Sequence, residues 1–153
     1  MSRGRVAVAV RVRAPAQAVW EAVTDWPAQG DWMPATHVRP VGGDGRGVGG
    51  RIEAFTGIGR LGFLDTMVVT EWRPPNWCAV RHTGRVVRGT GAFAVEEPAE
   101  DDGLAPGTVR LVWYEDLELP GGAVGALGWR LIRRFIGEGV GWSLGRLARS
   151  VER

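Results

Sequence analysis

The sequence predicts an α+β fold in which one antiparallel sheet packs against a single long helix at the C-terminus. Between residues 37 and 119, turns rich in glycine and proline separate short runs of β-forming residues. Residues 121–153 instead repeat apolar side chains at helical spacing, and no other long segment does so. A run of strands followed by one dominant helix is typical of α+β architecture and not of alternating βα units.

The N-terminal residues predict a first strand followed by two short helices. Residues 5–13 alternate, with valine at every even position from 6 to 12, as in a half-buried strand. Pro15 suits the first turn of a helix that ends near residues 25–27. The inner face of that helix is formed by Ala16, Val19, Trp20 and Val23. A second, short helical turn is expected around residues 31–33.

The middle of the chain predicts an antiparallel meander of six further strands. They are expected near residues 37–41, 51–56, 62–72, 77–84, 88–97 and 108–119. Pro74-Pro75 and the acidic segment 96–107 are expected to be turns. The result is a seven-stranded sheet that curves around the last helix. Where sheet and helix do not fully meet, an internal cavity can remain.

The closing segment carries two apolar stripes on one predicted helix. The first stripe, expected to be the core seam, consists of Trp129, Ile132, Ile136, Val140, Leu144, Leu147 and Val151. The second consists of Val124, Leu127, Leu131, Phe135 and Trp142. One seam is enough to hold a helix on a sheet, so we expect the second stripe to meet a ligand or a partner.

Six glycines between residues 125 and 145 interrupt this helical pattern. Each costs about 1 kcal/mol relative to alanine in a helix interior, so some feature must offset them. One explanation is close approach of the helix to the sheet, or a kink at Gly137, Gly139 and Gly141. The other is that small residues leave room for a ligand under the helix.

Composition limits the class of protein. The 153 residues fit one domain spanning 1–153, and the net charge of +2 is too small to indicate nucleic-acid binding. The single cysteine, Cys78, cannot form an internal disulfide, and two histidines give no recognisable metal spacing. No apolar run is long enough to span a membrane. We therefore expect a cytoplasmic protein without metal or transmembrane segment.

Two motif matches lack the structural context that their chemistry needs. Residues 57–62 match GxGxxG, but a predicted strand follows, so no helix N-terminus is available to bind a pyrophosphate. Residues 141–145 match GxSxG, but they lie inside the predicted helix and no histidine follows them. Neither dinucleotide binding nor a serine hydrolase is expected, and no cofactor is predicted.

Four segments, in this order and spacing, resemble a known superfamily. They are VWEAVTDWPAQGDWMP, VVTEWRPPNW, GTGAFAVEEP and VRLVWYEDLELPGG. Together with the closing helix they resemble the START-like or SRPBCC superfamily, in its polyketide cyclase/dehydrase and lipid-transport branch. The resemblance implies a helix-grip fold that encloses a hydrophobic pocket. Similar proteins include aromatase/cyclases, lipid carriers and hormone receptors, so the fold alone does not choose a function.

Two carboxylates share a strand face with apolar side chains. Asp65 has the parity of Phe63 and Met67, and Glu115 has that of Trp113 and Leu117. If these faces line the pocket, each carboxylate must be paired, hydrogen-bonded or protonated. Either one is then a candidate general base, and a structural ion-pair network is the alternative.

Cyclising a poly-β-keto chain requires proton abstraction from carbon, stabilisation of an enolate and proton delivery to a leaving hydroxyl. We expect Asp65 or Glu115 to be the base, His82 to shuttle a proton, and Arg88 or Arg81 to hold the enolate or a carboxylate. The apolar residues expected to contact the ligand are Trp32, Phe63, Met67, Phe93, Trp113, Leu117, Leu131 and Phe135. A non-catalytic carrier or sensor of a lipid-like ligand is the alternative.

Arginines on the closing helix raise the question of partners besides a hydrophobic small molecule. Arg130, Arg133 and Arg134 cluster on one side of the helix. Such a surface fits a membrane or an acidic carrier protein, although solvated faces are the commoner reason for charge on a helix. The second apolar stripe also allows a homodimer.

Overall fold

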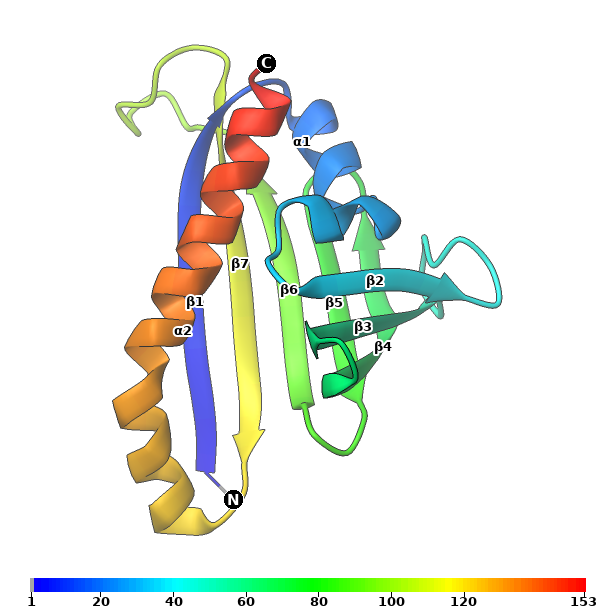
Figure 1. Cartoon of the computed structure of the whole chain (residues 1–153). Coiled ribbons are helices and arrows are strands. Elements are labelled where there is room, and N and C mark those ends of the chain that lie inside the picture. The colour runs from blue at the N-terminus through cyan, green and yellow to red at the C-terminus, as the bar shows by residue number, and fades with distance from the viewer. Residues whose placement is uncertain (1) are drawn as a thin grey trace.

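The computed structural model describes residues 2–153 and contains one seven-stranded antiparallel sheet beside a 30-residue helix (Figure 1). The sheet order is β1-β7-β6-β5-β4-β3-β2. In chain order the elements are β1 Ser2–Arg13, α1 Ala16–Val23, η1 Pro27–Asp31, β2 Thr36–Val41, β3 Arg51–Ile58, β4 Leu61–Arg73, β5 Trp77–Thr83, β6 Arg88–Glu96, β7 Thr108–Leu119 and α2 Gly122–Val151. The predicted fold class, a curved sheet with a long C-terminal helix, is confirmed.

The first and last strands pair along their whole length and form the part of the sheet on which α2 lies. β1 pairs with β7 from Ser2 opposite Leu119 to Arg13 opposite Thr108. α2 runs along β1 and packs mainly on that strand (Figure 1). At Gly4 a Cβ atom would lie 2.6 Å from the Trp129 ring, so the missing side chain lets the indole pack directly on the strand.

The second short helix begins earlier than the sequence predicts. It is the 3₁₀ helix η1 at Pro27–Asp31, and not a turn at residues 31–33. Proline has a fixed φ and no N–H to lose, so it fits the first helical position, and Pro27 begins a helix instead of ending one. The change matters for the site, because η1 leads directly into Trp32 and Met33.

The hydrophobic core lies at the end of the molecule where α1 and the last turns of α2 meet the sheet. Its largest fully buried apolar side chains are Trp20, Ile52, Leu111, Leu144, Leu147, Val12, Val19, Val23, Val69 and Val95. Trp20 packs edge-on against Trp72 of β4, with 4.9 Å between ring centroids. This cluster draws on both helices and most strands.

The predicted core seam of α2 is buried over only part of its length. Leu144 and Leu147 are buried, and so is Trp129, but Ile132 is 51% exposed and does not belong to the core. The reason is that the first half of α2 lies over β1, the edge strand, so few positions on each turn are covered. The second stripe, by contrast, is exposed throughout. Its apolar surface is surplus to the core, as the sequence predicts.

The glycines of α2 support both explanations that the sequence leaves open, at different positions. A Cβ atom on Gly141 would lie 3.5 Å from Val8 Cγ1, so this position faces β1 at ordinary contact distance. A Cβ atom on Gly139 would meet nothing within 4 Å, and Gly139 lines the internal cavity. α2 continues without interruption from Gly122 to Val151.

Candidate functional site

A cavity of about 400 Å³, partly open to solvent, lies between the sheet, η1 with the residues that follow it, and the middle of α2. We call it the internal cavity. Its wall is mostly apolar. The apolar side chains that line it include Met33, Ile52, Ala54, Phe63, Met67, Val80, Val87, Phe93, Trp113, Leu117, Ile136 and Val140. The volume falls within the usual range for small-molecule sites.

Three ionisable side chains meet in this apolar wall. His82 of β5 stands between Asp65 of β4 and Glu115 of β7. Its Nδ1 lies 2.8 Å from Asp65 Oδ1, and its Nε2 lies 3.0 Å from Glu115 Oε2. The imidazole is 3% exposed and each carboxylate 15%, so this Asp65–His82–Glu115 cluster is largely removed from solvent.

The cluster joins β5 to β7 across the intervening strand β6, and two glycines make this possible. Gly89 pairs with His82 on one side of β6, and Gly91 pairs with Glu115 on the other. A Cβ atom on Gly91 would lie 2.9 Å from Glu115 Oε2. Because β6 presents no side chain here, side chains from the strands on either side of it can reach each other.

The two carboxylates hold His82 in its charged form. Burial lowers the pKa of the imidazole, but the hydrogen bonds to Asp65 and Glu115 and the charges of both carboxylates outweigh it and raise the pKa from 6.5 to about 9. At neutral pH His82 is therefore an imidazolium, and each ring N–H donates to a carboxylate. It can act as a proton donor inside the cavity.

The two carboxylates differ in how many of their oxygens are already occupied. Glu115 Oε2 accepts from His82, and Oε1 accepts from Trp113 Nε1 at 2.8 Å. Asp65 accepts through Oδ1 only, and no donor among residues 2–153 reaches its Oδ2. Asp65 thus keeps an unused acceptor beside the cavity, whereas Glu115 is held in place from both sides.

A family model described as polyketide cyclase/dehydrase and lipid transport matches residues 3–152. The chain belongs to this family. Solved structures with a similar fold include the ZhuI aromatase/cyclase of Streptomyces sp. R1128, with 17% identity and a TM-score of 0.76 over 99% of this chain and 95% of that one. A START superfamily protein of Mycobacterium smegmatis has 18% identity and a TM-score of 0.64 over 97% and 94%. A comparison with curated protein sequences finds no match.

The chain is a member of the cyclase/dehydrase and lipid transport family, and most of its predicted site residues lie around the cavity. Asp65, His82 and Glu115 line it, as do Phe63, Met67, Phe93, Trp113 and Leu117. Trp32 stands directly behind, with its ring centroid 6.5 Å from that of Phe93 and 6.1 Å from that of Trp113. These positions do not test the predicted roles, which stay predictions.

Besides Trp32, three predicted ligand contacts lie outside the cavity wall. Leu131 and Phe135 are 67% and 72% exposed on the outer side of α2. On the inner side of the same helix, Ile136 and Val140 line the cavity. Arg88 is exposed and forms an ion pair with Glu118 at 3.3 Å. Its strand parity is opposite to that of the inward-facing Phe93, so Arg88 points away from the cavity.

Sequence reasoning missed residues of the wall that follow η1 and others that lie on β3 and β5. Met33, Pro34 and Thr36 follow η1, and no local pattern indicates that they face the cavity. Cys78 also lines it. Cys78 and His82 have the same strand parity on β5, so the sequence did carry a signal that both face the cavity. Burial raises the pKa of the Cys78 thiol to about 12, so it is a neutral part of the wall and not a nucleophile. Within residues 2–153 no cluster of His, Cys, Asp or Glu could hold a metal ion.

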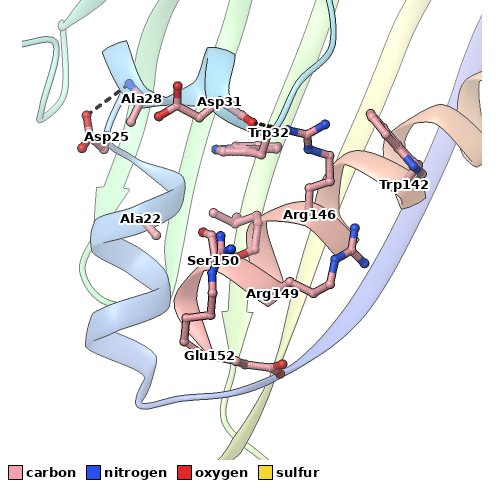
Figure 2. A pocket seen from close by; sticks show the side chains of 12 residues that line it. Ala22, Asp25, Ala28, Asp31, Trp32, Trp142, Arg146, Arg149, Ser150 and Glu152 are labelled. Carbon is pink, nitrogen blue, oxygen red and sulfur yellow. Dashed lines mark hydrogen bonds between the residues drawn. The ribbon is translucent and has the colours of Figure 1, made fainter.

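A second, larger hollow lies between α1, η1 and the end of α2 (Figure 2). This cleft of about 850 Å³ has a mixed polar wall with as many acidic as basic side chains: Asp25, Asp31 and Glu152 against Arg146, Arg149 and Arg153. Arg146 is already engaged, because it donates to Asp31 O at 2.9 Å. The indole N–H of Trp32, buried beside this cleft, has no acceptor among residues 2–153. Since the cleft holds no paired acid and base, the smaller internal cavity is the better candidate site.

Proposed function

We propose that this protein binds a hydrophobic, polycyclic or polyketide-like small molecule in the internal cavity and catalyses its cyclisation or dehydration by acid–base chemistry. The observation that carries the proposal is the histidine held between two carboxylates in an otherwise apolar wall. A charged proton donor beside a carboxylate with a free oxygen supplies both an acid and a base. Membership in a family described as polyketide cyclase/dehydrase and lipid transport supports the substrate class.

In the proposed reaction Asp65 is the base. It takes a proton from a methylene carbon between two ketone groups, and the electron pair of the broken C–H bond forms an enolate. The enolate carbon attacks a second carbonyl carbon, and a C–C bond closes the ring. His82 donates a proton to the resulting alkoxide, which becomes a hydroxyl. We assign the donation to Nδ1, the ring nitrogen that faces the base, because Nε2–H then keeps its hydrogen bond to Glu115, which Trp113 also holds in place.

The ion pair between His82 and Asp65 allows the cluster to be reset. After ring closure the base is protonated and the imidazole is neutral. Transfer of the proton across the 2.8 Å contact restores the imidazolium and the carboxylate. Dehydration then uses the same groups: Asp65 removes a second proton from carbon, His82 protonates the hydroxyl, and water leaves as a C=C bond forms. No further reactant is needed.

Aromatic side chains on the wall suit a flat ligand. Phe93 and Trp113 have ring centroids 5.2 Å apart, and both line the cavity. Trp32 packs against them from behind and limits their movement. A polycyclic ligand can therefore lie against rings that are already fixed, which reduces the entropy lost on binding.

A non-catalytic carrier or sensor of a lipid-like ligand is the second candidate. One observation favours it: the three charged groups already satisfy one another, as in a structural ion-pair network. In that case the cluster stabilises the wall of the cavity and transfers no proton. The two candidates predict the same ligand class but different effects of neutralising Asp65.

The experiment compares Asp65→Asn with Glu53→Gln on a short poly-β-keto thioester. Product formation is followed by absorbance, and ligand binding by quenching of tryptophan fluorescence. We expect Asp65→Asn to lower turnover by about 10²- to 10⁴-fold with little change in binding. Glu53, paired with exposed Arg39 on a neighbouring strand, is the matched control for loss of a carboxylate. Turnover that is equal in both variants would overturn the catalytic assignment and leave the carrier.

A further inference from the structure

Most of the large exposed apolar side chains lie on three segments of the chain. The segments are the β3–β4 connection at 57–64, the β5–β6 connection at 84–88 and the first half of α2 at 122–136. The exposed apolar residues on them are Ile58, Leu61, Phe63, Leu64, Val86, Val124, Leu127, Leu131, Ile132 and Phe135. We call these three segments the apolar rim.

The apolar rim surrounds one side of the internal cavity. Each of its segments contributes one residue to the cavity wall: Phe63 from the first, Val87 from the second and Ile136 from the third. In Figure 1 both connections and the start of α2 lie in the lower half of the molecule, away from the core under α1. Ile58 and Leu61 at the tip of the β3–β4 hairpin are 82% and 83% exposed, and exposed apolar residues grouped in one patch mark an interaction site.

The composition of the rim is unusual. Its segments contain no aspartate, glutamate, serine, threonine, asparagine or glutamine. The polar residues are all arginine: Arg60, Arg85, Arg88, Arg130, Arg133 and Arg134. Two of these form ion pairs, Arg88 with Glu118 and Arg134 with Glu138, and the other four form none with residues 2–153. The rim therefore combines exposed aliphatic and aromatic side chains with uncompensated positive charge.

We propose that the apolar rim docks the protein onto the surface of an anionic lipid bilayer. Arginines would bind the headgroups, and the apolar side chains between them would enter the boundary with the acyl chains. No helix within residues 2–153 is both long and apolar enough to cross a bilayer, so the association is with the surface. The cavity wall then adjoins the lipid, from which a hydrophobic ligand can enter. This docking does not depend on the acid–base chemistry proposed above.

Two other occupants fit the rim less well. A second copy of the chain in a two-fold dimer would place the same surface on both sides, so arginines would face arginines. A protein partner would be expected to form about one hydrogen bond per 100–200 Å² of interface, and arginine is the only side chain here that offers directional polar groups. Binding to an anionic bilayer surface requires positive charge for the headgroups and apolar side chains that reach the acyl chains, and the rim supplies both.

The test is co-sedimentation of the full chain with vesicles of neutral phosphatidylcholine and with vesicles that also contain phosphatidylglycerol. We expect at least tenfold stronger binding to the anionic vesicles. The triple variant R85Q/R130Q/R133Q should weaken it by about 100-fold, since each arginine near an anionic surface contributes about fivefold. The triple variant R11Q/R149Q/R153Q changes the net charge equally, away from the rim, and should weaken it much less.

A second pair of measurements separates the apolar part of the rim from its charge. I58S/L61S at the hairpin tip should lose most binding to anionic vesicles at unchanged net charge. Equal binding to both vesicle types, or equal loss in the two arginine variants, would overturn the proposal. The proposal would also be overturned if the protein binds no vesicles and the rim variants instead abolish a concentration-dependent dimer or a complex with an acidic carrier protein. Turnover of a water-soluble substrate by R85Q/R130Q/R133Q reports separately on the proposed function.

Discussion

The two ends of α2 have different surroundings, although apolar residues recur at helical spacing through both. At the packed end, residues 143–151, Leu144 and Leu147 are buried against the core, and α1 lies alongside. At the open end, residues 122–136, only Trp129 is buried, and Leu131 and Phe135 face outward. The periodicity of a helix therefore shows how many apolar faces it has, but not which of them the rest of the protein covers.

The difference follows from what lies beside each end. The packed end has helix α1 and the core on its inner side. The open end has only the edge strand β1 beneath it, so one or two positions per turn are covered. Between the two ends, Ile136, Gly139 and Val140 form part of the cavity wall. One helix thus supports the fold at one end and leaves the cavity accessible at the other.

The largest expected effect separates the packed end from the open end directly. Leu144→Ala should lower the free energy of unfolding by about 2–5 kcal/mol, because it leaves a void in a fully buried site. Leu131→Ala should change it by less than about 0.5 kcal/mol, because that side chain is mostly exposed. Urea denaturation of both variants measures the difference, and equal losses would contradict the distinction between the two ends.

The next effect is expected from the Asp65–His82–Glu115 cluster, and it depends on pH. The folded-state pKa of His82 is raised from 6.5 to about 9, so the imidazolium stabilises the folded state fully below pH 6.5. This contribution is lost as the pH rises through about 9. Between these values the unfolding free energy should fall by up to about 1.4 kcal/mol per pH unit. Denaturation of wild type and His82→Gln across this range measures it, and a slope that survives in the variant would assign it to another group.

The sequence predicts the strands well because their signals are local. Valine alternation at residues 6–12 and the glycine-rich turns mark elements without reference to the rest of the chain, and parity places Asp65 and Glu115 on the inner face. The bridge through His82 is different. It requires the register of β5, β6 and β7, and it requires Gly89 and Gly91 between His82 and Glu115. These are long-range features of the fold.

Most of the misassigned residues have the same kind of cause. Ile132 has core periodicity, but its exposure is decided by where the sheet ends beneath the helix. Leu131 and Phe135 fall on a surplus stripe, and periodicity cannot tell a cavity wall from an outer surface. For Arg88 a local signal did exist, because its parity is opposite to that of Phe93 on the same strand.

The smallest expected effect on stability lies at the boundary between the two ends, at Gly139. Adding a side chain there meets no atom within 4 Å, so Gly139→Leu should stabilise the helix by up to about 1 kcal/mol. The new side chain would extend from the cavity wall and reduce the space for a ligand. We therefore expect at least tenfold weaker binding of a polarity-sensitive naphthalene dye, together with unchanged or higher stability.

Gly128→Leu is the matched control for this prediction. Its Cβ atom also meets nothing within 4 Å, but Gly128 does not line the cavity. Both variants should gain similar helical stability in thermal denaturation, and only the change at Gly139 should weaken dye binding. Equal dye binding by the two variants would mean that the space beside Gly139 is not used by ligands. The glycines of α2 would then serve only the approach of the helix to β1.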